Sequence, residues 1–142
     1  MHDRASVAAV LETCLYAADL DTTAAFYEDV LGLNVDSRVE GRHVFFRCGP
    51  AMFLLFDPRG TGSSGSSVPA HGTTGPGHVC FAIADDALDA WREQLMNANV
   101  QIEHEQSWPR GGRSIYVRDP AGNSVELASP KIWGIGGLRP DT

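Results

Sequence analysis

Residues 41–47, GRHVFFR, recur in similar form at residues 112–118, GRSIYVR. Each stretch is the third strand in the same predicted order of elements: strand, helix, strand, strand, strand. A four-stranded sheet with a single helix leaves one face of the sheet uncovered, so two such units should associate side by side. The sequence therefore predicts one structural unit that is present twice.

The boundaries of these elements follow from hydrophobic alternation and from turn residues. Asp19 or Asp21 can cap the first helix and Gly32 can end it. Asp85 or Asp86 can cap the second helix, and Asn99 can take the left-handed position after it. In the first copy we expect strands at 9–17, 33–38, 42–48 and 51–56 and a helix at 22–31; in the second copy, strands at 78–84, 100–105, 113–118 and 124–128 and a helix at 87–98.

We predict one α+β domain, in which two tandem βαβββ modules form a cupped mixed sheet with the helices on its outer face. Module one covers about residues 9–58 and module two about 78–129. The Gly/Ser-rich segment 59–77 is a linker, because it has too little apolar surface to order alone. The tail 130–142 contains Ile132, Trp133, Ile135 and Leu138, so we expect it to pack on the domain or on a partner subunit.

Composition and charge exclude several classes of partner. The chain has 142 residues and a net charge of −7, which disfavours binding to nucleic acid and to anionic membrane surfaces. No apolar run is long enough to span a bilayer. Three cysteines without a close-spaced pair fit reduced thiols better than a disulfide framework. We therefore expect an acidic, soluble protein of the cytoplasm.

Three side chains on the predicted strands have the chemistry of metal ligands. Alternation places Glu12, His78 and Glu126 opposite the apolar sets of their strands, on the concave side of the sheet. Glu12 and His78 begin equivalent strands of the two modules, so quasi-twofold symmetry should bring them near each other. Two carboxylates and an imidazole suit a divalent metal ion. Separately, each residue also has an ordinary structural interpretation, as a surface glutamate, a core histidine or an ion-pair partner.

Other residues could line the same cleft. His43 and Phe45 share a strand face, and Tyr116 could bind substrate or donate a proton, although a structural role is the simpler interpretation. His71, on the linker, could fold over the mouth of the cleft or remain solvated. Trp108 could form an aromatic wall and Arg113 an anion-binding group, or both could belong to an ordinary turn.

The chain resembles the vicinal-oxygen-chelate superfamily, which includes glyoxalases, bleomycin resistance proteins and extradiol dioxygenases. The resemblance covers about residues 9–129 and is most specific in the closing segment DPAGNSVEL, residues 119–127. LET at 11–13 with DLD at 19–21, FY at 26–27 with VLGL at 30–33, and GHVCF at 77–81 resemble the signatures that open the two modules.

The resemblance implies up to four metal-ligand positions, which fall on Glu12, Leu54, His78 and Glu126. Leucine cannot bind a metal, and glyoxalase I enzymes have an oxygen ligand at the Leu54 position, so this departure argues against glyoxalase I chemistry. Leu54 would then contact substrate instead, and Glu126 would have a catalytic role beside Tyr116. The three remaining ligands suit Mn²⁺, Fe²⁺, Ni²⁺, Zn²⁺ or Mg²⁺.

The function implied is that of a metal-dependent lyase, isomerase or transferase, which chelates two adjacent oxygens of a small metabolite. One alternative is a metal-free, drug-sequestering protein resembling bleomycin resistance proteins. Another is an Fe²⁺ extradiol-type dioxygenase, in which Glu12 would replace a histidine. Superfamily members of this length commonly form homodimers, and the sequence leaves open whether Glu12 and His78 of one site share a chain.

Overall fold

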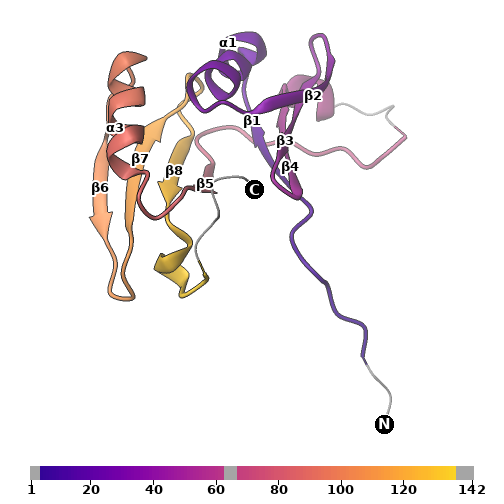
Figure 1. Ribbon diagram of the computed structural model, residues 1–142. Coiled ribbons are helices and arrows are strands. Elements are labelled where there is room, and N and C mark those ends of the chain that lie inside the picture. Colours follow the sequence, from indigo (N-terminus) through magenta and orange to yellow (C-terminus); the bar gives the residue numbers. More distant parts are fainter. Residues whose placement is uncertain (1–3, 63–66, 137–142) are drawn as a thin grey trace.

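The computed structural model describes residues 4–62 and 67–136 (Figure 1). Module one contains a short α-helix that continues directly into a π-helix, followed by three strands. Its elements are β1 (Glu12–Tyr16), α1 (Leu20–Ala25), the π-helix η1 (Phe26–Val30), β2 (Asn34–Val39), β3 (His43–Cys48), β4 (Ala51–Phe56) and the short α2 (Pro58–Thr61).

Module two repeats this order. Its elements are β5 (His78–Ala82), α3 (Leu88–Asn97), β6 (His104–Ser107), β7 (Arg113–Arg118) and β8 (Ser124–Ala128), followed by the 3₁₀-helix η2 (Pro130–Trp133). In Figure 1, α3 lies over the sheet of module two, and α1 lies at the top of module one.

The two sheets have the same topology. Their strand orders are β1-β4-β3-β2 and β5-β8-β7-β6, with β1–β4 and β5–β8 parallel and the other pairs antiparallel. The segments 41–47 and 112–118 therefore supply the equivalent strands β3 and β7. This arrangement confirms the predicted α+β class with two tandem βαβββ units.

Both modules contribute to one hydrophobic core. Leu15 and Phe53 of module one and Val79 and Leu95 of module two belong to the same buried cluster. Tyr27, which is fully buried, contacts the Phe81 ring at a centroid distance of 6.2 Å. Because this core lies on the helix-covered side, the opposite sheet faces are left to form sites.

The closing turn of module two binds the modules together. The Tyr27 hydroxyl donates a hydrogen bond to Oδ2 of Asp119 at 2.6 Å, and both residues are buried. The Asn123 side chain donates to the backbone oxygen of Tyr16 at 3.2 Å and accepts from the Gly77 amide at 2.8 Å. The segment that begins β8 is thus fixed by module one.

Most local predictions are confirmed, and several boundaries differ. Asp19 caps α1, and Gly32 and Asn99 have positive φ values of 76° and 58°. However, the first strand starts at Glu12, not at residue 9, and the first helix starts at Leu20, not at residue 22. An unexpected short helix, α2, runs from the end of module one into the linker, because Asp57 caps it and Pro58 fits its first turn. The strand expected at 100–105 begins only at His104.

The predicted acidic cap of the second helix is wrong. The N-cap residue of α3 is Ala87, which makes no side-chain hydrogen bond. Asp85 instead accepts a hydrogen bond from Ser129 and forms an ion pair with Lys131, at 3.4 Å. This carboxylate is therefore used to fix η2 and the start of the tail.

The tail was expected to pack on the domain or on a partner. Ile132 lies against Gly112, whereas Trp133 and Ile135 are 70% and 61% exposed. Leu138 lies outside the described residues. Within 4–62 and 67–136, no helix has the length and apolar character needed to cross a membrane.

Candidate functional site

The open face of module two contains a cavity of about 400 Å³. Its floor is formed by side chains of β5, β7 and β8, and its wall by the 108–110 turn and by η2. The lining residues are His78, Cys80, Trp108, Pro109, Arg110, Tyr116, Glu126, Ile132 and Trp133. Four of the residues predicted from sequence to form a site, His78, Trp108, Tyr116 and Glu126, are therefore brought together here.

His78 and Glu126 direct a ring nitrogen and a carboxylate oxygen at each other. His78 Nδ1 lies 3.1 Å from the backbone oxygen of Ser124, which can only accept, so Nδ1 carries the proton. The Nε2 atom lies 3.2 Å from Oε1 of Glu126, where a protonated ring donates a hydrogen bond to the carboxylate and a neutral ring offers a lone pair. The pair can therefore share a proton, as an ion pair, or bind a metal ion.

The second carboxylate oxygen of Glu126 is held by a buried hydrogen bond. The hydroxyl of Ser114 donates to Oε2 of Glu126 at 2.5 Å, and the indole N–H of Trp108 donates to the Ser114 oxygen at 2.8 Å. Glu126 is 6% exposed and Ser114 is fully buried. Oε1 is therefore the oxygen that remains directed at His78.

Glu126 also affects its other neighbours in the cavity. Tyr116 pairs with Glu126 across β7 and β8 and stacks on the His78 ring. Desolvation, followed by the charge of Glu126 and a hydrogen bond with it, raises the pKa of Tyr116. The same causes in the same order raise the pKa of Cys80 to about 12. Both groups are thus protonated at neutral pH and can act as donors.

Four further predicted residues lie on the open face of module one. His43 stacks on Phe45 at a centroid distance of 3.8 Å and accepts a hydrogen bond from Arg42 at 2.6 Å. Desolvation, and then the positive charge of Arg42, lowers the pKa of His43. Leu54 is 6% exposed and pairs with Phe45 across β3 and β4.

His71 is fixed on the same sheet. Its Nδ1 atom is hydrogen-bonded to the Tyr16 hydroxyl at 2.6 Å, and its ring contacts that of Phe56 at a centroid distance of 4.7 Å. The linker histidine therefore contacts module one and does not line the cavity of module two.

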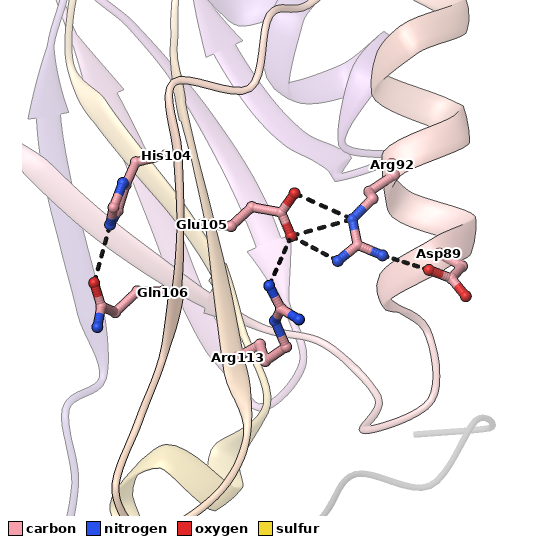
Figure 2. A network of polar contacts seen from close by, with 6 residues as sticks. All are labelled: Asp89, Arg92, His104, Glu105, Gln106 and Arg113. Atoms are coloured by element: carbon pink, nitrogen blue, oxygen red, sulfur yellow. Dashed lines mark hydrogen bonds and ion pairs between the residues drawn. The ribbon is translucent and has the colours of Figure 1, made fainter.

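Arg113 points toward the helix side of its sheet. It shares a strand face with the buried core residues Ile115 and Val117. Its side chain lies 3.6 Å from Glu105, which also binds Arg92 of α3 (Figure 2). This network joins α3 to β6 and β7. Arg113 is not among the residues that line the cavity, where Arg110 supplies the positive charge.

Glu12 is separated from the other two predicted ligands. It is exposed at the start of β1, whereas His78 shares a small cavity with Cys14, Leu15 and Tyr16 further along that strand. Within residues 4–62 and 67–136, no three His, Cys, Asp or Glu side chains are grouped to hold one metal ion. Of the three predicted ligands, His78 and Glu126 are thus the two that converge in the described part of the chain.

Sequence reasoning missed Ser114 as part of the site. Ser114 lies two residues before Tyr116, so strand alternation already placed both on the open face. A serine in a strand, however, carries no sequence signal of a functional role. The register Ser114↔Ala128 and Tyr116↔Glu126 makes Ser114 the diagonal neighbour of Glu126. That relationship appears only when the two strands are paired. Ile132 and Trp133 were expected to pack, but not to form a cavity wall.

Paired four-stranded sheets with tandem βαβββ order and convergent His and Glu side chains define a glyoxalase-like fold. The model of the Glyoxalase/Bleomycin resistance protein/Dioxygenase superfamily matches residues 9–127. The chain therefore belongs to this superfamily.

Several known proteins are similar to it. A crystal structure of lactoylglutathione lyase from Agrobacterium tumefaciens is 45% identical, with a TM-score of 0.87, over 91% of this chain and 98% of that one. A glyoxalase/bleomycin resistance protein/dioxygenase from Nocardioides shares the fold at 23% identity and a TM-score of 0.69, over 88% of this chain and 85% of that one. The protein YwbC of Bacillus subtilis (strain 168), whose function is uncharacterized, is 25% identical over 81% of this chain and 92% of its own length.

Proposed function

We propose that this protein is a metal-dependent lyase that acts on a small metabolite with two adjacent oxygen atoms. The observation that carries the proposal is the meeting of His78 Nε2 and Glu126 Oε1 at 3.2 Å, with the Nδ1 proton of His78 bound to the Ser124 carbonyl. A histidine that binds a metal through one nitrogen usually donates its other N–H in this way.

The side chains around this pair have complementary roles in the proposal. A divalent cation bound there would stabilise negative charge on the two substrate oxygens. The Tyr116 hydroxyl, whose pKa is raised, would donate a hydrogen bond or a proton to one of these oxygens. Trp108 and Trp133 would exclude water from the cavity, and Arg110 would attract an anionic group.

We further propose that the site is completed by Glu12 of a second copy in a homodimer. The basis is that Glu12 lies apart from His78 and Glu126 within one chain, on the open face of module one. The equivalent faces of the two modules both carry polar and aromatic side chains. Leu54 offers no oxygen, so the proposed ligands are one imidazole and two carboxylates.

The first test is the metal content of the protein purified without an affinity tag or chelator. We expect near-stoichiometric divalent metal in the parent and its loss in His78→Ala and Glu126→Ala. His104→Ala and Glu93→Ala serve as matched controls, because neither residue lines the cavity. If the parent contains none and takes up none from excess Mn²⁺, Fe²⁺, Ni²⁺ or Zn²⁺, the metal-dependent function is refuted. The aromatic cavity and the net charge of −7 would then favour sequestration of a cationic drug.

A mixing experiment tests the two-copy site. Glu12→Ala and Glu126→Ala proteins are each expected to lack bound metal. After unfolding and refolding together in equal amounts, about one quarter of the sites should bind metal, because half of the dimers would contain one intact site. If each site lies within one chain, mixing restores none.

The substrate to test first is lactoylglutathione, which is named for the 45%-identical relative. We expect its cleavage or formation to depend on added metal and on Glu126. Activity that is absent with lactoylglutathione but present with other vicinal dioxygen compounds would fit the leucine at position 54. Consumption of O₂ would indicate the dioxygenase alternative.

A further inference from the structure

Glu126 is held by a chain of hydrogen bonds that ends at the wall of the cavity. The chain runs from the Trp108 indole to the Ser114 hydroxyl and on to Oε2 of Glu126, with distances of 2.8 and 2.5 Å. Ser114 and Glu126 are buried, whereas Trp108 is 37% exposed. A group at the surface is thus connected to a buried carboxylate through one hydroxyl.

The direction of both hydrogen bonds is fixed by chemistry. The indole N–H can only donate, so the Ser114 oxygen must accept from Trp108. A serine hydroxyl has one proton, and that proton is then left for Oε2 of Glu126. If Trp108 moved away, the Ser114 oxygen would lose this donor and the hydroxyl could rotate away from Oε2 of Glu126.

Trp108 is placed so that a ligand in the cavity would contact it. It begins a tight turn, in which its amide donates to the Gly112 carbonyl at 3.2 Å and its carbonyl accepts from Gly111 at 3.0 Å. Gly112 and Gly111 have positive φ values of 79° and 102°, so the turn depends on glycine at these positions. The indole lines the same cavity as His78.

We propose that Ser114 is a positioning residue for Glu126, and that Trp108 sets the direction of its hydroxyl. A ligand that displaces the Trp108 ring then changes how the Glu126 carboxylate is held. The coupling of indole to carboxylate stands on the hydrogen bonds alone; its consequence for metal binding rests on the proposed function.

The coupling can be measured in metal-free protein by the ¹⁵N–¹H resonances of the tryptophan indoles. Trp108→Phe identifies the Trp108 resonance, and Trp91, on α3, is the internal control. Glu126→Gln should shift the Trp108 resonance in the parent background but not in a Ser114→Ala background. Ser114→Thr, which keeps the hydroxyl, should restore the response. If the Trp108 resonance is the same in Ser114→Ala as in the parent, the proposal is overturned.

Metal affinity gives a second readout. Groups that orient a metal ligand typically contribute about 10–100-fold to affinity, so Ser114→Ala should weaken Mn²⁺ binding by that factor and Ser114→Thr should recover most of it. Unchanged Mn²⁺ affinity in Ser114→Ala would overturn the positioning role. If the parent binds no metal but the indole response depends on Ser114, the coupling is supported and only the metal-dependent function fails.

Discussion

Replacement of Tyr27 by phenylalanine tests the contact that joins the two modules. Tyr27 lies in the π-helix η1 of module one, and its hydroxyl donates to Asp119 in the closing turn of module two at 2.6 Å. Tyr27 is 0% and Asp119 3% exposed, so water cannot easily replace the lost donor. Desolvation, then the charge of Asp119 and the hydrogen bond to it, raises the pKa of Tyr27, which keeps the phenol protonated as a donor.

The expected loss follows from the type of hydrogen bond. A bond to a charged acceptor contributes about 1.5–3 kcal/mol. Oδ2 of Asp119 keeps one other donor, the Asn123 side chain at 2.9 Å, so the lower half of that range applies. We expect Tyr27→Phe to lower the free energy of unfolding by about 2 kcal/mol and the melting temperature by about 6–8 °C.

Urea unfolding of the parent and the variant measures this difference. Tyr16→Phe is a matched control, because its hydroxyl bonds to His71 at a partly exposed position and should cost less than about 1 kcal/mol. Both modules share one core, so a single transition is expected in each protein. A loss below about 0.5 kcal/mol in Tyr27→Phe would refute the view that this buried bond stabilises the module interface.

Three further predictions concern pH and packing. The pKa of His43 is lowered from 6.5 in the folded state, so the free energy of unfolding should fall as pH drops below 6.5, until the folded pKa is reached. In urea unfolding at a series of pH values, His43→Phe should show a weaker pH dependence than the parent. An unchanged pH dependence would contradict the burial argument. The hydrogen bond from Arg92 lowers the pKa of Glu105, so stability should be lost below the unfolded value of about 4.5, and Glu105→Gln should lose less than the parent between about pH 5 and 3. Gly77→Ala would place a methyl group 2.8 Å from Leu15 and should cost about 1–2 kcal/mol; a neutral effect would mean that Leu15 can move aside.

Features that depend on neighbouring residues were predictable from sequence. The turn before β8 forms because Asp119 accepts backbone hydrogen bonds from Ala121 and Asn123, both at 2.9 Å, and because Gly122 has φ of 90°. Strand alternation then directs Glu126 to the open face. Both results need only local geometry and the two-residue period of a strand.

The candidate site was only partly predictable. His78 and Glu126 were placed together correctly, since they lie on adjacent strands of one module. Glu12 was expected beside His78, in the same chain or across two chains; within this chain, the approach of β1 to β5 brings Cys14, Leu15 and Tyr16 to His78. Arg113 was expected in the cleft, yet it lies on the core-facing side of its strand and pairs with Glu105.

The sequence by itself determined the duplicated βαβββ order, the turns and the face on which each strand side chain lies, because these depend on short-range backbone geometry. Only the tertiary structure decided which side chains meet: the Trp108–Ser114–Glu126 chain, the contact of His78 with Glu126 at 3.2 Å, and the placement of Cys14, Leu15 and Tyr16 beside His78. The physical reason is that such meetings depend on strand register and on the angle at which two modules pack, and these are set by the shared core as a whole.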